Sequence, residues 1–262
     1  MAVSQSRTLW TVIIAAAPLA WVLYTKAVYN ASTTVSFTLD NTDTQNDLNS
    51  DVLPAEVQQD RDAWIVVRER IVSKPFQTTS TRQTKGEEKS RLSGLLDTYL
   101  RTTMRLFTYT PQAWLMRRLM TDPEARRTFE TGYLSSCDFA VGDRVCGVYV
   151  VTSRSAPRQE EDEEGRETVV LVLAPPQGWT GPVVKGRLIA VLEEEEQKEE
   201  DMEGGNGVRT IRAVNETVLW RRREGEAPVF LEGAVGRWLH AFMVQWMVIR
   251  GVQTVKREIE MW

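Results

Sequence analysis

His240 is the only histidine in this 262-residue chain, and histidine is the side chain best suited to proton transfer near neutral pH. A carboxylate could act with it as the acid or base, and the sequence offers Asp138, Asp143 and Glu216 as candidates. His240 stands in a strongly apolar segment, where a lone histidine is more often structural than catalytic. No nucleophile elbow, phosphate-binding loop or dinucleotide fingerprint accompanies it. His240 is therefore the one catalytic candidate, and whether the protein is an enzyme stays open.

The composition argues against a zinc site and a nucleic-acid surface, no motif indicates a cofactor, and a carboxylate-only site for a hard cation stays an open alternative. One histidine and two cysteines are too few for a structural zinc site, which needs a fuller set of Cys and His ligands. The acidic stretches 159–167 and 193–203 lack the ordered ligand spacing of a calcium loop, so we interpret them as solvated loop tips. The formal net charge is -4, and no basic stripe with interleaved aromatic residues indicates a nucleic-acid surface.

The segment Gly233–Arg250 is predicted to form an almost wholly apolar helix, because its large side chains recur every three or four residues while the intervening ones are also apolar. Its aromatic and sulfur-containing side chains are of the kind that line adaptable apolar pockets. The ligand-lining candidates are Trp238, Phe242, Met243, Trp246 and Met247. The alternative is a dense core without a cavity.

The N-terminal segment Leu9–Tyr24 carries no charge, is bracketed by Arg7 and Lys26, and has aromatic residues near its ends. This pattern predicts a membrane-spanning anchor at residues 1–27, with membrane lipid as a partner. A cleaved signal peptide and a buried core helix are the alternatives. We expect a single-pass protein of the endoplasmic reticulum or another endomembrane; the mitochondrial inner membrane is the alternative.

Modification of four residues, by glycosylation or by disulfide formation, would indicate that the domain lies in a lumenal compartment. Asn30 and Asn215 each begin a glycosylation sequon, although Asn30 is close to the predicted membrane and Asn215 lies in a predicted strand. Cys137 and Cys146 could form a disulfide across a bend in an oxidising compartment, and two buried free thiols are the alternative.

The middle of the chain alternates predicted helices and loops. Residues 28–53 are polar and are interpreted as a tether, with one possible edge strand at Val35–Leu39. A helix is expected over Ala55–Val72, a loop over Lys74–Ser90, and two amphipathic helices within Arg91–Met120, separated at Pro111. Between Asp60 and Arg127 there are 14 basic against 8 acidic residues, an excess that would suit anionic lipid or the acidic half of the same molecule.

The second half of the domain has the pattern of an antiparallel sheet. Alternating apolar residues predict four strands, within Phe139–Ser153, Glu167–Ala174, Gly181–Glu193 and Val208–Arg222. Their connections are too short or too polar to carry crossover helices, so the strands should form a meander. Helices, then strands, then a long apolar helix define an α+β fold, with residues 54–262 as a single domain.

The order of elements over about Phe129–Arg250 resembles the helix-grip (START-like) architecture, in which an antiparallel sheet wraps a long C-terminal helix around an apolar cavity. A hot-dog-like fold is the alternative and would use Arg91–Met120 as its central helix. The stretches GYLSSCDFAVGDRVCGVY, from Gly132, and Gly233–Gly251 are also similar to uncharacterised membrane-anchored proteins of filamentous fungi found beside secondary-metabolite genes.

Three functions are compatible with these features. The first is a membrane-anchored accessory protein that binds an apolar small molecule between the sheet and the C-terminal helix, in fungal secondary-metabolite biosynthesis. The second is an enzyme of the same fold that uses His240. The third is a structural or assembly protein of an organelle membrane, with a protein partner that the sequence does not identify.

Overall fold

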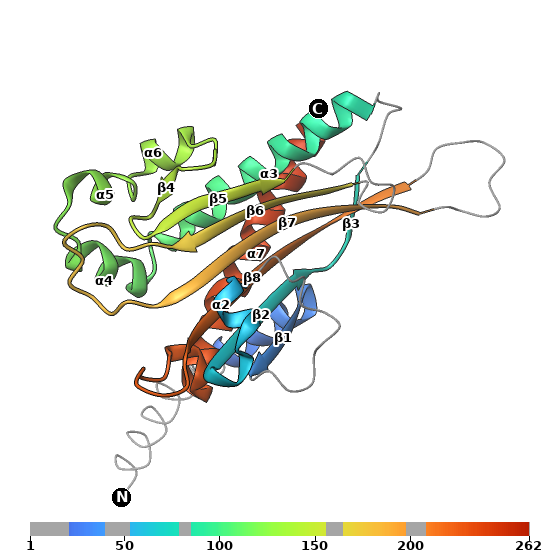
Figure 1. Cartoon of the computed structure of the whole chain (residues 1–262). Helices are drawn as coiled ribbons and strands as arrows, with labels where there is room; N and C mark the ends of the chain where they lie inside the picture. The colour runs from blue at the N-terminus through green and yellow to red at the C-terminus, as the bar shows by residue number, and fades with distance from the viewer. Residues whose placement is uncertain (1–20, 40–52, 79–84, 156–164, 198–207, 262) are drawn as a thin grey trace, which may run out of the picture.

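The computed structural model describes residues 21–39, 53–78, 85–155, 165–197 and 208–261. These residues form one antiparallel sheet with long helices on one of its faces, so the expected α+β class with a C-terminal helix is confirmed (Figure 1). The strands are β1 (Thr33–Leu39), β2 (Trp64–Ser73), β3 (Phe76–Thr78), β4 (Arg144–Val145), β5 (Tyr149–Ser155), β6 (Arg166–Leu173), β7 (Lys185–Gln197) and β8 (Val208–Arg222).

The sheet order is β1-β2-β8-β7-β6-β5-β4, and β3 pairs with β8 beyond the end of β2. The predicted meander is therefore confirmed for β5 to β8. The last strand of the meander then pairs with β2, which comes from the first half of the domain. This pairing places β1 and β2 beside the C-terminal part of the chain.

The helices are α2 (Ala55–Gln59), α3 (Lys85–Phe107), α4 (Pro111–Leu119), α5 (Pro123–Arg127), α6 (Thr131–Ser136) and α7 (Ala234–Met261), with short 3-10 turns at η2 (Arg61–Ala63) and η3 (Phe230–Glu232). A further helix covers 21–32. The break predicted at Pro111 is confirmed, because the Thr110 hydroxyl caps α4 by accepting a hydrogen bond from the Ala113 N–H at 3.2 Å.

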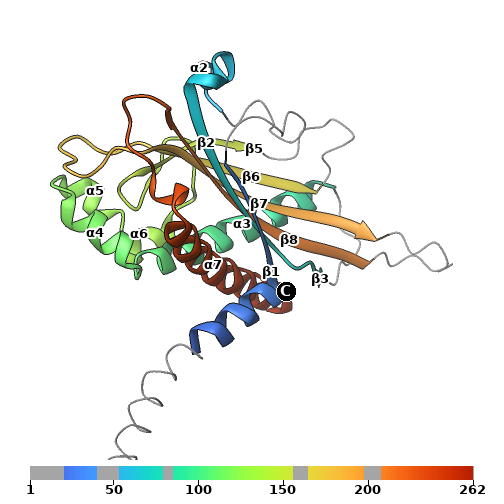
Figure 2. The same cartoon turned by 90° about the horizontal axis from the view of Figure 1, so that it is seen from below.

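The main core lies between the sheet and the pair of long helices, α3 and α7, on one face. Figure 2 shows α7 below the strands and α2 above them. Gly251 allows the close approach of the two helices, since a Cβ atom there would lie 2.7 Å from the Tyr99 ring. The apolar residues that recur every three or four positions in α3 are buried in this core, as the predicted amphipathic helix requires: Leu92, Leu95, Leu96, Tyr99, Leu100, Met104 and Phe107.

A smaller apolar cluster covers the opposite face of the sheet, where Val57 of α2 packs against Trp64, Val66 and Trp220. The two clusters explain why the prediction of one helix over Ala55–Val72 is wrong. That helix ends at Gln59, and β2 follows from Trp64. Alternate residues of β2 enter opposite clusters, which is a strand period rather than a helical one.

The folded body begins earlier in the chain than the sequence indicates. The possible edge strand is real, because β1 pairs with β2 along its whole length, and helix 21–32 leads into it. Residues 28–39 are thus not a tether. The loop expected at Lys74–Ser90 likewise contains β3 and the start of α3.

The predicted anchor, Leu9–Tyr24, lies outside the described residues up to residue 20. Within the described ranges, no helix combines the length and the apolar character needed to cross a bilayer.

Candidate functional site at the junction of residues 21–32 with α7

His240 bonds to a carboxylate that the sequence did not indicate. Its Nδ1 atom lies 2.6 Å from Oε1 of Glu69, whose side chain is only 2% exposed, against 15% for the imidazole. Glu69 lies on the helix-covered face of the sheet because it shares the alternation of Val67 and Ile71 in β2. A strand interpretation of that segment would have placed a glutamate among inward-facing apolar residues, which is the signal that could have found it.

The three predicted carboxylate partners of His240 are engaged elsewhere. Glu216 lies on the opposite face of the sheet and accepts two hydrogen bonds from Arg68, at 2.6 and 2.9 Å. Asp138 pairs with Arg101 at 3.0 Å. Asp143 accepts the backbone N–H of Ala140 at 2.8 Å. The expectation that one of them partners His240 is therefore wrong.

Gln245, one turn further along α7, holds helix 21–32 against the body. Its side chain is fully buried. Its Oε1 atom accepts from the Lys26 ammonium at 2.5 Å, and its Nε2 atom donates to Thr33 Oγ1 at 2.9 Å and to Asn30 Oδ1 at 3.1 Å. One buried amide thus satisfies partners from both the helix and β1.

Lys26 is also coupled to Glu69. Partial burial lowers the pKa of the Lys26 ammonium, and the negative charge of Glu69 opposes this shift. The buried carboxylate therefore has two cationic or potentially cationic neighbours, Lys26 from helix 21–32 and His240 from α7. Burying an unpaired carboxylate costs free energy. The interactions of Glu69 with Lys26 and His240 therefore stabilise the junction.

A row of three aromatic rings runs along the outer side of this junction. Trp238 stacks on Phe242 with ring centroids 5.9 Å apart, and Phe242 contacts Tyr29 at 5.2 Å. We call these residues the aromatic row. Large apolar residues of helix 21–32 and of the first turns of α7 are exposed, and we call them together the apolar strip: Trp21, Leu23, Tyr24, Val28, Val235, Trp238 and Leu239.

The predicted ligand-lining residues do not share one space. Met247 is buried in the main core, and Met243 and Trp246 pack against that core. Trp238 is instead 44% exposed and belongs, with Phe242, to the aromatic row. Although the segment is apolar almost throughout, its first turns are not covered on all sides: α3, the sheet and helix 21–32 pack against α7 and leave Val235, Trp238 and Leu239 exposed. A surface pocket of about 400 Å³ lies elsewhere, between α5 and α6, and is lined by Asp122, Glu124, Ala125, Arg127, Thr128, Tyr133 and Arg144.

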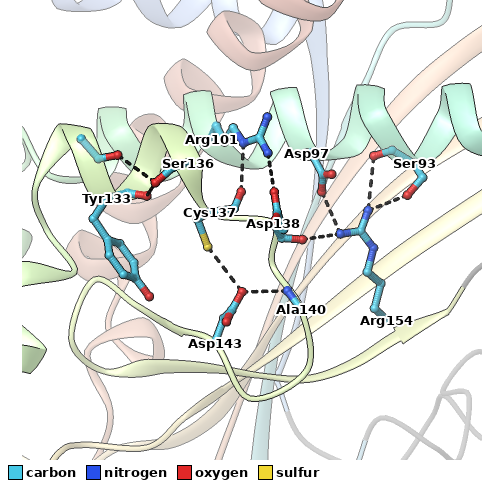
Figure 3. A network of polar contacts seen from close by, with 11 residues as sticks. Ser93, Asp97, Arg101, Tyr133, Ser136, Cys137, Asp138, Ala140, Asp143 and Arg154 are labelled. Atoms are coloured by element: carbon cyan, nitrogen blue, oxygen red, sulfur yellow. Dashed lines mark hydrogen bonds and ion pairs between the residues drawn. The ribbon is translucent and has the colours of Figure 1, made fainter.

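Cys137 and Cys146 are buried free thiols in this structure, which is the second of the two alternatives, and they do not form a disulfide. Figure 3 shows Cys137 pointing toward Asp143, with 3.7 Å between Sγ and Oδ2. The Cys146 thiol instead faces the Met104 carbonyl at 3.8 Å. Burial raises the pKa of both thiols.

Arg154 is the centre of a second polar cluster, which fastens β5 to α3 (Figure 3). Its guanidinium contacts Asp97 at 2.8 Å and Glu167 at 3.4 Å, and it donates to the Ser93 hydroxyl at 2.6 Å. It also donates to the Asp138 carbonyl at 2.5 Å. Because these contacts engage every guanidinium nitrogen, this cluster has the character of a structural clamp rather than a ligand site.

The two sequons differ in accessibility. Asn215 is only 5% exposed and lies in β8 between Ile71 of β2 and Ala190 of β7. A side chain there has no room for a glycan, so its glycosylation in the folded protein is excluded. Asn30 is exposed on helix 21–32, although its Oδ1 atom accepts from Gln245, and its glycosylation stays a prediction.

No protein-family model matches this chain, and comparison with curated proteins gives no match either. The site must therefore be interpreted from its own geometry. The imidazole of His240, held by a buried carboxylate, has the arrangement of an acid–base pair. The same bond also joins α7 to β2 near the place where helix 21–32 docks. The most exposed side chains of the junction are the apolar ones of the strip.

Proposed function

We propose that the protein is a membrane-surface accessory protein, attached through residues 1–27 and resting on the bilayer through the apolar strip. The observation that carries the proposal is the exposure of the strip: Trp21 is 69% exposed, Tyr24 66% and Val235 71%. Large exposed apolar patches on soluble monomers usually mark a binding site, and these side chains are on two helices that dock on each other. Trp and Tyr are also the side chains enriched at the membrane–water interface.

The attachment of helix 21–32 to the body supports this proposal. The apolar sequence that precedes residue 21 continues directly into a helix held by Gln245 and Glu69. A chain that entered lipid before residue 21 would therefore bring α7, with Trp238 and Leu239, close to the same surface. Ring contacts along the aromatic row connect the two elements.

The proposal includes the binding of an apolar small molecule, which the resemblance to helix-grip proteins implies. An apolar ligand would find adaptable aromatic side chains at Trp238 and Phe242, on the outer side of α7, because the inner side is packed against α3 and the sheet. We therefore place any such ligand between this row and the membrane. The endomembrane location and the role in secondary metabolism stay predictions.

The test uses the chain from residue 21 onward, so that residues 1–20 make no contribution to lipid binding. This chain should float with phosphatidylcholine vesicles and be released by carbonate, because a partly inserted face binds reversibly. Trp238→Ser with Leu239→Ser should reduce flotation severalfold while circular dichroism stays unchanged. The matched control is Val141→Ser, an exposed valine after α6. Equal flotation of the double variant and the control, or no flotation at all, would refute the proposal.

A further inference from the structure

The outward side of α4 has an exposed apolar and basic surface outside the junction. Trp114 is 64% exposed and Leu115 51%, and Arg118 follows on the same face one turn later. Tyr109, just before the helix, is 71% exposed. The inward side holds Ala113, which is buried in the main core. We call Tyr109, Trp114, Leu115, Arg117 and Arg118 the α4 surface.

This surface is held rigidly. The N-terminus of α4 is capped by Thr110, and Thr110 also donates from its hydroxyl to the Phe107 carbonyl at 2.8 Å. At the other end, the Thr180 hydroxyl donates to the Leu119 carbonyl at 3.0 Å, and Met120 enters the core. The aromatic and apolar side chains are thus presented on a fixed helix, which lowers the entropy cost of binding.

The charge around α4 is positive. Residues 109–127 contain four arginines and two acidic residues, and Arg117, Arg118, Arg126 and Arg127 are all exposed. Arginine binds phosphate through its planar, weakly hydrated guanidinium, and a basic group near an anionic bilayer adds a favourable interaction. An exposed Trp and Leu beside arginines therefore fit a surface on which charged headgroups lie above apolar chains.

We infer that the α4 surface is a second membrane contact that selects anionic phospholipid headgroups. The inference rests on the proposed function and adds lipid selectivity to it. In both views α4 lies in the same half of the molecule as the first turns of α7 (Figures 1 and 2). Contact at two separate places would fix the rotation of the body on the bilayer, which one attachment point leaves free. The α4 surface also differs from the strip in chemistry, because it combines apolar side chains with adjacent arginines.

The experiment uses the full chain reconstituted in vesicles, with an environment-sensitive dye on Leu115→Cys or on Leu239→Cys and a quencher attached to the lipid. Cys137 and Cys146 are buried and do not compete for the dye. Quenching at position 115 should increase when phosphatidylserine is added to phosphatidylcholine. Arg117→Gln with Arg118→Gln should abolish that increase and leave quenching at position 239 unchanged. Lys74→Gln with Arg257→Gln, which removes the same charge from exposed positions elsewhere, should keep it.

The outcomes separate the two proposals. Quenching at position 239 without a phosphatidylserine-dependent increase at 115 overturns the α4 contact and leaves the proposed function intact. Absence of quenching at 239 overturns the proposed function and, with it, this inference. A dye at position 115 that responds to a soluble acidic peptide but not to phosphatidylserine would also overturn the inference, in favour of a protein partner.

Discussion

The imidazole Nδ1 atom of His240 and the Oε1 atom of Glu69 lie 2.6 Å apart, joining α7 to β2 across 171 positions of the chain. Glu69 is almost wholly enclosed, and Lys26 is close enough for the carboxylate charge to affect its pKa. The pair is therefore a structural requirement of the junction that orients the apolar strip. This relationship leads to the first prediction.

Removing the partner of a buried carboxylate should destabilise the protein strongly. His240→Ala leaves Glu69 short of a partner, so we expect a loss of about 3–5 kcal/mol in the free energy of unfolding. Glu69→Gln should cost less, because a neutral amide is cheaper to bury. Urea unfolding of both single variants and the double variant gives the coupling energy. A coupling energy near zero would show that the contact does not hold the junction.

Gly251 should be intolerant of a side chain. A Cβ atom there would lie 2.7 Å from the Tyr99 ring and 2.9 Å from Thr103, so Gly251→Ala should cost about 1–3 kcal/mol by overpacking the contact between α3 and α7. Gly94→Ala is the control, since a Cβ atom on α3 at that position meets nothing within 4 Å and alanine favours helix. Thermal melting should separate the two variants in opposite directions. A Gly251→Ala variant as stable as the native protein would contradict the packing described.

The contribution of Glu167 to the free energy of unfolding should decrease as the pH rises. Burial raises the pKa of its carboxyl above the ordinary 4.5, and the Ser93 hydrogen bond and the Arg154 charge only partly oppose this. The folded protein thus retains the proton to higher pH than the unfolded chain. The contribution of Glu167 to stability is therefore greatest below pH 4.5 and declines as pH rises toward the folded pKa.

The matched comparison is with Glu167→Gln, which has no proton to lose. The free energy of unfolding of the native protein, relative to that of this variant, should decrease from pH 4.5 upward and then level off. Urea titrations at a series of pH values measure it. Glu260→Gln, an exposed change near the end of α7, should show no such trend. A difference that grows with pH would contradict the burial of Glu167.

Both cysteines should react slowly in the folded protein. Burial raises the pKa of Cys137 and Cys146 above the ordinary 9.0, so little thiolate exists at neutral pH, and the thiolate is the reactive form. Maleimide labelling should be slow in buffer and should reach two groups per chain in denaturant without reductant. Finding no free thiol in denaturant would mean that the two residues pair as a disulfide after all.

Helices with a single apolar face could be predicted from the sequence. Which side of the almost wholly apolar helix α7 is buried could not, because contacts with other elements decide it. Leu92 to Phe107 repeat with a helical period and face the core as expected. Residues 64–73 combine β-branched residues with charged ones and follow a true helix start at Ala55, so the sequence predicts one helix across β2 and does not indicate Glu69. On α7 nearly every position up to Ile249 is apolar, so the sequence could not indicate that α3 would cover one side and leave Trp238 and Leu239 exposed. The helix also continues past Arg250, where Val252 and Val255 remain buried while Gln253, Lys256 and Arg257 are exposed.

The most direct test of the membrane-facing surface compares two dye positions on the full chain in vesicles that carry a lipid-attached quencher. Leu239→Cys lies on the apolar strip, and Gln59→Cys lies on exposed α2, across the sheet from α7. Lipid contact through the strip predicts strong quenching and a blue-shifted emission at position 239, and neither at position 59. Equal and weak quenching at the two positions would contradict the proposal that the apolar strip rests on the membrane.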